Sequence, residues 1–299
     1  MWNVMVTAMN EGLFDHDFFD KLNTVKMSLN MRLNQGMSGS RKSSAKGSSV
    51  EFSDFREYML GDDIRRIDWN AYGRTDKLYI KQFMEEKEGL FRFFIDTSSS
   101  MEFGEKKKSV MALRLTAAFS YIIMNNLDRV FINEMRGEQL VKGKGVSGGA
   151  AFSHLLKDLE RITFSGDTHI NRCIQTCTIP RGGVSIIVSD FLDPSGVENA
   201  IKYLVSRKQA VVLIQVLARE EIDVDYEGTL NILDMETNER VKITMSNAAI
   251  RNYHKCLDDM KEELSRLSRK YGVHYVSVVS DEDLVTVILS SFMGILASV

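Results

Sequence analysis

The sequence predicts an α/β fold: a mostly parallel β-sheet with helices on both faces, together with a small antiparallel β module. From residue 90 onward, short apolar runs alternate with longer segments of helical periodicity, which is the pattern of repeated strand and helix units. A hydrophobic content of 44% in 299 residues supplies enough apolar side chains for a large core. These two observations favour one α/β domain with a smaller module attached.

The strands expected in the parallel sheet are five short apolar runs, at residues 90–95, 129–134, 184–189, 210–217 and 273–279. The helices expected around them lie near residues 105–127, 150–161, 169–177, 195–207, 247–271 and 281–297. Near the start of the chain, large apolar residues recur at intervals of three and four, which predicts an amphipathic helix within residues 1–35. We expect that helix to pack on the α/β domain or on a partner.

The β module is expected to form from two regions of the chain. Alternating apolar and polar residues predict strands around 50–58 and 77–86, within a region that spans residues 36–89. A second strand pair near 229–245 is inserted in the α/β domain at 90–299. We expect this inserted pair to join the first two strands.

Composition and charge exclude several classes of protein. The net charge of −3 argues against a general nucleic-acid binder. Three scattered cysteines lack the paired spacing of a zinc site and suit a reducing cytosol. The N-terminus lacks the basic flank and apolar run of a signal peptide, and the uncharged C-terminal stretch Leu284–Val299 is too short to span a bilayer. We therefore expect a cytoplasmic protein with no transmembrane segment, for which peripheral membrane association stays open.

Oxygen-bearing side chains follow the ends of two predicted strands and open a predicted helix. The motif Asp96-Thr97-Ser98-Ser99-Ser100 follows the strand at 90–95. Asp190 follows the strand at 184–189, and Thr168 lies in the loop that opens a helix. In open α/β sheets, ligands bind at the carboxyl ends of the strands, near the point where the strand order reverses. Hard divalent cations take oxygen ligands, and Mg2+ usually keeps some positions for water or foreign oxygens.

A site for Mg2+, or for Mn2+ or Ca2+, is therefore predicted at Asp96, Ser98, Ser100, Thr168 and Asp190. Two carboxylates balance a divalent charge without completing the ligand shell, so an acidic side chain of another protein would supply a remaining oxygen. Taken singly, each of these residues is more often the cap of a following helix. Their joint occurrence in this chain order favours the cation site.

This constellation resembles the metal-ion-dependent adhesion site of the von Willebrand factor A fold, a Rossmann-like fold with a mostly parallel sheet. The resemblance implies that Ser98 and Ser100 bind Mg2+ directly, that Thr168 binds it directly or through water, and that the two aspartates bind it mainly through water. Phe191 stands where that family often has a glycine, a departure that affects the shape of the loop more than the ligand chemistry.

A second motif lies upstream of the sheet, in Glu51-Phe52, Arg56-Glu57-Tyr58, the string Gly61–Trp69 and Arg74. It resembles the signature of the bacterial domain-of-unknown-function 58 family, von Willebrand factor A-like proteins that accompany MoxR-type AAA+ ATPases. The resemblance extends from about residue 36 to the C-terminal helix and implies a MoxR-type ATPase as a partner.

The charged and aromatic residues of this second motif leave two interpretations open. They can form a structural brace in which arginine forks hold carboxylates, or a partner surface centred on an aromatic anchor and arginines. The residues concerned are Arg56, Asp62, Asp63, Arg65, Arg66, Asp68, Trp69 and Arg74.

The leading hypothesis is a non-enzymatic, chaperone-like adaptor that assembles or remodels another protein. Its Mg2+ site would grip an acidic residue of an unknown client or of the ATPase. The chain has no Gly-x-x-x-x-Gly-Lys-Ser loop for nucleotide phosphates, so ATP-driven work must come from a partner. The alternative is a hydrolase in which the metal activates water at the same site. A third interpretation is a degenerate site whose oxygens only cap helices, with no cation.

Overall fold

A computed structural model of the protein describes residues 12–36, 51–84, 88–224, 228–233 and 240–291. The chain divides into two compact units. The larger unit comprises Met1–Leu33 with Gly89–Val299, and the smaller one comprises Asn34–Glu88. The N-terminal helix therefore belongs to the same unit as the α/β sheet.

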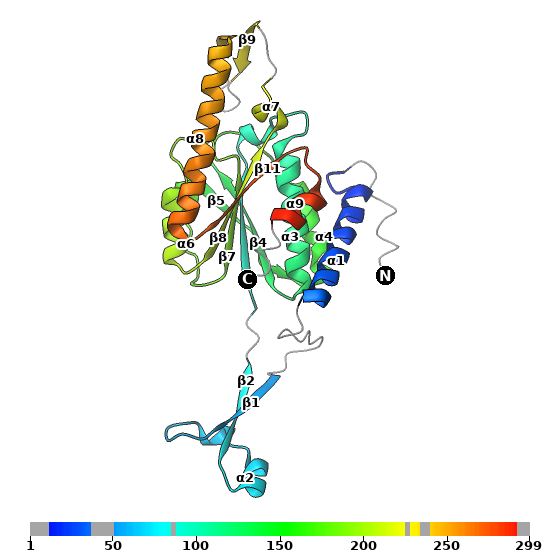
Figure 1. Ribbon diagram of the computed structural model, residues 1–299, viewed down its shortest axis with the longest axis vertical. Coiled ribbons are helices and arrows are strands. Elements are labelled where there is room, and N and C mark those ends of the chain that lie inside the picture. The colour runs from blue at the N-terminus through cyan, green and yellow to red at the C-terminus, as the bar shows by residue number, and fades with distance from the viewer. Residues whose placement is uncertain (1–11, 37–50, 85–87, 225–227, 234–239, 292–299) are drawn as a thin grey trace. The chain divides into compact units, whose positions relative to one another are not determined.

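The larger unit is built on a seven-stranded sheet with the strand order β11-β8-β7-β3-β4-β5, in which β6 also pairs with β4 (Figure 1). The strands are β3 (Leu90–Asp96), β4 (Arg129–Arg136), β5 (Gln139–Lys142), β6 (Val146–Ser147), β7 (Val184–Ser189), β8 (Ala210–Leu217) and β11 (His274–Val279). The five strands predicted from apolar runs are all present, and they pair in parallel. β5 and β6 pair antiparallel to β4 and were not predicted.

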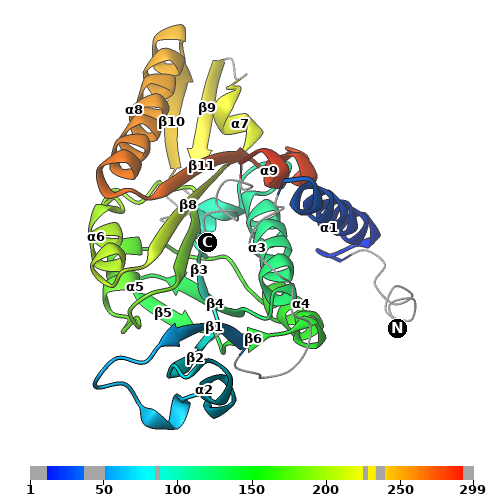
Figure 2. The same cartoon turned by 60° about the horizontal axis from the view of Figure 1, so that its bottom comes forward.

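Helices cover both faces of this sheet (Figures 1 and 2). The core on one face includes α1 (His16–Gly36), α3 (Lys108–Asn125), α4 (Phe152–Glu160) and α9 (Leu284–Ser291). The core on the other face includes α5 (Ile170–Gln175), α6 (Glu198–Ser206) and α8 (Asn247–Tyr271). Strand residues alternate between the two cores: Phe93 and Ile95 join the first and Phe94 joins the second. A strand covered on both faces has to be apolar throughout, which explains why β3 and β7 appear in the sequence as continuous apolar runs.

The predicted fold class is confirmed by this arrangement of a mostly parallel sheet between helical layers. None of the helices in the described ranges is both long and apolar enough to cross a lipid bilayer.

The order of the strands places the carboxyl ends of β3 and β7 side by side. After β3 the chain adds β4 on one side, and it later returns to place β7 on the other side of β3. The direction in which strands are added therefore reverses between β3 and β7. Open α/β sheets bind their ligands at such a reversal point, so the fold directs attention to the residues that follow these two strands.

The smaller unit contains a two-stranded antiparallel sheet of β1 (Glu51–Glu57) and β2 (Tyr79–Met84), with α2 (Trp69–Thr75) between the strands. The inserted strands β9 (Gly228–Leu233) and β10 (Arg240–Met245) form a separate two-stranded sheet. The expectation that the inserted pair joins the N-terminal strands is therefore wrong. Each pair stands as its own sheet, because two antiparallel neighbours satisfy each other's backbone hydrogen bonds without a further strand. The turn expected at 236–239 lies outside the described residues.

The N-terminal helix α1 contributes large buried side chains to the first core. Phe14, just before the helix, and Phe18, Leu22 and Val25 within it have between 0% and 2% of their surface exposed. They recur at the intervals from which the helix was predicted. Phe14 and Phe18 also pack on each other, with ring centroids 5.0 Å apart.

Phe18→Ala is expected to lower the free energy of unfolding of the larger unit by about 3–5 kcal/mol, because it removes a buried ring and leaves a cavity. Urea denaturation monitored by far-UV circular dichroism would measure the change. Met27→Ala is the matched control, since 66% of Met27 is exposed on the same helix, and a change within about 0.5 kcal/mol is expected for it. Equal stability of Phe18→Ala and the wild type would contradict a shared core.

Candidate metal site

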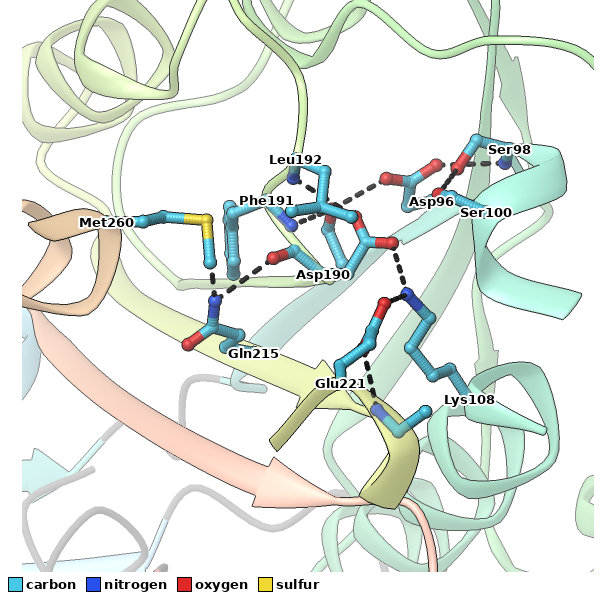
Figure 3. Close-up of polar contacts among 12 residues, drawn as sticks. Asp96, Ser98, Ser100, Lys108, Asp190, Phe191, Leu192, Gln215, Glu221 and Met260 are labelled. Carbon is cyan, nitrogen blue, oxygen red and sulfur yellow. Dashed lines mark hydrogen bonds and ion pairs between the residues drawn. The ribbon is translucent and has the colours of Figure 1, made fainter. Parts of the chain in front are cut away.

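Two buried aspartates lie at the carboxyl ends of β3 and β7 (Figure 3). Asp96 is the last residue of β3 and Asp190 directly follows β7; they are 3% and 1% exposed. The Asp96 Oδ2 atom accepts a hydrogen bond of 2.6 Å from the Ser189 hydroxyl, so the two strand ends are joined through a side chain. The Asp96 Oδ1 atom accepts the backbone N–H of Ser98 at 2.9 Å. The Asp190 Oδ1 atom accepts the backbone N–H of Leu192 at 3.1 Å.

The two motif serines lie next to each other immediately after Asp96. Their Oγ atoms are 3.0 Å apart. Adjacent ligands of an octahedral Mg2+ ion, each about 2.0–2.1 Å from the metal, are separated by roughly 3 Å. The separation of the Ser98 and Ser100 oxygens therefore suits two neighbouring ligands of one Mg2+ ion.

Backbone hydrogen bonds tie the loop that carries Thr168 to the serine loop. Ser99 N–H donates to the Gly166 carbonyl, and Ser165 N–H donates to the Thr97 carbonyl, both at 2.8 Å. The Thr168 hydroxyl donates to the carbonyl oxygen of Met135 at 3.2 Å. This bond uses the hydroxyl's one donor and leaves acceptor capacity on Oγ1. All five predicted ligands therefore lie at the same edge of the sheet.

A buried lysine is also part of this site and was missed from the sequence. Lys108, in the first turn of α3, has 0% of its surface exposed. Its Nζ atom donates to Asp190 Oδ2 at 2.8 Å and to Glu221 Oε1 at 2.6 Å. Glu221 belongs to α7 (Arg219–Ile222), the short helical turn after β8. The one signal in the sequence was a lysine in the first turn of an apolar helix, where the helix dipole disfavours a positive charge.

The electrostatics of the site reflect an excess of buried acids. Burial raises the pKa of the Asp96 carboxyl above its ordinary value, and the charge of Asp190 raises it further, against the hydrogen bonds from Ser189 and Ser98. Burial by itself lowers the pKa of Lys108, but the charges of Asp190 and Glu221 outweigh that effect and the pKa of Lys108 is raised. The paired acids therefore favour the charged form of Lys108, whereas burial and the neighbouring acid disfavour the charged form of Asp96.

The loop after Asp190 holds a strained residue. Phe191 has φ of 59°, in the left-handed region that favours glycine. This conformation explains why a glycine is common at the position in the family that the motif resembles. In Phe191 the backbone strain, about 1–3 kcal/mol for such a residue, is opposed by burial of the ring in the second core and by an N–H donation of 2.9 Å to the Ser189 hydroxyl.

The interpretation of these side chains as helix caps receives little support. Ser98 occupies the cap position of the 3-10 turn Ser99–Glu102, but its side chain makes no capping hydrogen bond. At the start of α5, the N–H of Ile170 is accepted by Asp193 Oδ2 at 3.1 Å, not by Thr168. The hydroxyl groups of the predicted site are therefore not used to begin helices.

Across the described ranges, no three histidine, cysteine, aspartate or glutamate side chains gather in a group able to hold a metal ion. The five candidate ligands include two carboxylates and three hydroxyls. A metal at this site would therefore need the serine and threonine hydroxyl oxygens as ligands in addition to the two carboxylates.

In the smaller unit, several acids of the second motif are used within the unit itself. Arg56 Nη2 donates to Asp62 Oδ1 at 2.8 Å, and Asp62 Oδ2 accepts the N–H of Met59 at 2.9 Å. Asp63 begins the 3-10 turn Ile64–Arg66, and its side chain accepts the N–H of Arg65. These contacts match the brace interpretation within this unit.

The remaining residues of the second motif surround α2. Asp68 caps α2 by accepting the N–H groups of Asn70 and Ala71. Arg74 Nε donates to the carbonyl of Asn70 at 3.2 Å. Trp69, the expected aromatic anchor, has 64% of its surface exposed. The side chain of Arg66 lies outside the described part of the structure. The aromatic residue therefore matches the partner-surface interpretation, and Asp68 matches the brace.

Comparison with known proteins places the chain in a family. A family model described as "Protein of unknown function DUF58" matches residues 54–281. The chain belongs to this family. The resemblance inferred from the upstream motif is thereby confirmed.

The curated relatives include "Uncharacterized protein Rv1480" of Mycobacterium tuberculosis and "Uncharacterized protein Mb1516" of Mycobacterium bovis. Each is 22% identical over 271 residues, which cover 88% of this chain and 84% of the relative.

Similar solved structures include the conserved hypothetical protein BatB from Bacteroides thetaiotaomicron, with a TM-score of 0.45 at 15% identity, covering 70% of this chain and 99% of that one. The SpRpn10 VWA domain matches with a TM-score of 0.38 at 10% identity, covering 68% of this chain and 94% of that one. The strand order and the helical layers on both faces describe a mostly parallel α/β fold.

In metal-free buffer, Asp96→Asn is expected to raise the free energy of unfolding by about 0.5–2 kcal/mol, because it removes a buried charge beside Asp190 and keeps the side-chain shape. A carboxyl whose pKa is raised by folding loses stability as the pH rises above its ordinary value of 3.8. The gain should therefore be absent in acid and grow as the pH rises above 3.8. Urea denaturation with a chelator present would measure it.

The matched control for this experiment is Asp158→Asn on α4, whose side chain is 68% exposed. Its stability is expected to stay close to that of the wild type. A neutral-pH loss of stability in Asp96→Asn would show that the buried charge is favourable without a metal, contrary to the expectation.

Proposed function

We propose that the protein is a non-enzymatic interaction adaptor that binds a divalent cation, Mg2+ first and Mn2+ or Ca2+ as alternatives, and through it an acidic residue of a partner. The ligands would be Asp96, Ser98, Ser100, Thr168 and Asp190. The observation that carries the proposal is the 3.0 Å separation of the Ser98 and Ser100 oxygens beside two buried aspartates. When bound, the ion would supply a positive centre that attracts a carboxylate.

The donor set supports a ligand shell that a partner completes. It contains two carboxylates, which balance the charge of a divalent ion, and three neutral hydroxyls. Mg2+ takes six oxygens and binds through one or two carboxylates, keeping its other positions for water or for the ligand it recognises. A carboxylate of another protein is the kind of group that such a position would take.

A MoxR-type AAA+ ATPase is the proposed partner, with an unknown client protein remodelled or assembled in the cytoplasm. Membership of the DUF58 family supports this proposal, because the motif in residues 51–74 resembles that of proteins accompanying such ATPases. The exposed Trp69 is a candidate contact residue, since aromatic residues often anchor interfaces.

A metal-dependent hydrolase at the same residues is the weaker proposal. A general base beside the reacting water is expected in many such enzymes. Asp96 and Asp190 are used as proposed ligands, and Glu221, the remaining acid at this edge, is paired with Lys108. Metal-dependent turnover of phosphoesters or esters, lost in Asp96→Ala, would favour the hydrolase instead.

Ser98→Ala is expected to weaken Mg2+ binding by about 10–100-fold, because it deletes a proposed ligand. Isothermal titration calorimetry of the metal-free protein with Mg2+ would measure the affinity. Ser99→Ala is the matched control: it removes the neighbouring hydroxyl of the same motif, and its affinity should equal that of the wild type. Equal affinity in Ser98→Ala and the wild type would exclude the site.

A MoxR-type ATPase from the same organism is expected to co-purify with the wild-type chain in Mg2+. Recovery should fall several-fold with Ser98→Ala or with a chelator, and it should be retained with Ser99→Ala, because the proposed contact runs through the metal. Full recovery with a Ser98→Ala protein that no longer binds Mg2+ would rule out a metal-bridged contact with the ATPase.

A further inference from the structure

Lys108 places a positive charge inside the proposed metal site. Its side chain is wholly buried, and its Nζ atom lies 5.9 Å from the centre of the Phe103 ring. A buried ammonium group is costly unless carboxylates and hydrogen bonds compensate it. Lys108 has two such partners on separate elements, Asp190 after β7 and Glu221 in α7 (Figure 3).

The two partners of Lys108 have different positions relative to the candidate ligands. Asp190 is one of the five candidates, and the oxygen that does not bind Lys108 is engaged by the N–H of Leu192. Glu221 is not a candidate ligand. Its second oxygen accepts the N–H of Ala218 at 2.7 Å, which holds the carboxylate in place. An ammonium group that released Asp190 would therefore still have a fixed acceptor.

We propose that Lys108 is a built-in cation that competes with the divalent ion for Asp190, and that Glu221 retains the ammonium group when Asp190 turns to the metal. This inference rests on the proposed metal site. Its consequence is that the divalent affinity is weaker than the five ligands alone would give, because like charges a few ångströms apart repel. Lys108 and Glu221 together would set the metal concentration at which the adaptor becomes competent to bind.

The competition model makes opposite predictions for the two residues. Lys108→Met removes the competing charge, and divalent affinity is expected to rise by roughly tenfold. Glu221→Gln removes the group that retains the ammonium, so Lys108 is left on Asp190 and affinity is expected to fall by roughly tenfold. Lys106→Met, at an exposed lysine two residues away, is the matched control and should not change the affinity.

A double-mutant cycle separates competition from a general electrostatic effect. If Glu221 acts through Lys108, Glu221→Gln should have no effect, within about twofold, in the Lys108→Met background. If each charge acts on the metal independently, the effect of Glu221→Gln should be the same in both backgrounds. Titration calorimetry with Mg2+ and Mn2+ on the full chain gives all four affinities, and circular dichroism verifies that each variant is folded.

The outcomes distinguish this inference from the metal site itself. Binding that is lost in Asp96→Ala but unchanged in Lys108→Met would overturn the role of Lys108 and leave the metal site intact. Absence of binding in every variant, including the wild type, would overturn both. If Lys108→Met does not fold, Lys108→Gln takes its place in the cycle, and wild-type affinity in Glu221→Gln would overturn the proposal.

Discussion

The parallel pairing of β3 with β7 is the contact on which the rest of the site depends. Its register sets Ile95 beside Val188, so β3 ends in Asp96 at the edge of the sheet where Asp190 follows β7. Two buried carboxylates at one edge are unfavourable without compensation. Backbone N–H groups, the Ser189 hydroxyl and the Lys108 ammonium group supply it. The elements that carry these groups are thereby held around the strand ends.

The candidate cation site and the buried lysine have a common physical origin. Asp96, Asp190 and Glu221 contribute three acids to the region, and Lys108 contributes one buried base. The fold thus concentrates acidic side chains at the edge of the sheet where the strand order reverses. The loop at this edge contains Phe191, whose backbone is in the strained left-handed conformation. Sites of this kind often trade stability for function.

The motif at residues 51–74 contains both residues that stabilise the smaller unit and residues that are exposed on its surface. Its carboxylates close turns and begin α2, so they hold the smaller unit in shape. Its tryptophan is largely exposed. A residue string can therefore be characteristic of a family for two reasons at once, since the acids specify a local fold and the aromatic side chain stays available for contact.

The sequence by itself determined the five parallel strands and the main helices of the larger unit, together with the residue types of the candidate site. Hydrophobic periodicity is a local property, so β3, β7 and α1 could be predicted from neighbouring residues alone. The motif at Asp96–Ser100 could be recognised for the same reason. β5 and β6, with four and two residues, are too short to carry a periodic signal.

Only the tertiary structure decided which distant residues meet. Lys108 is separated by 82 positions from Asp190 and by 113 from Glu221, and nothing in the local sequence around it specifies either partner. The local sequence likewise did not specify that β9 pairs with β10 and not with β1 or β2. Such contacts depend on where whole helices and strands pack, because burial and charge compensation are satisfied by the complete fold and not by any one segment.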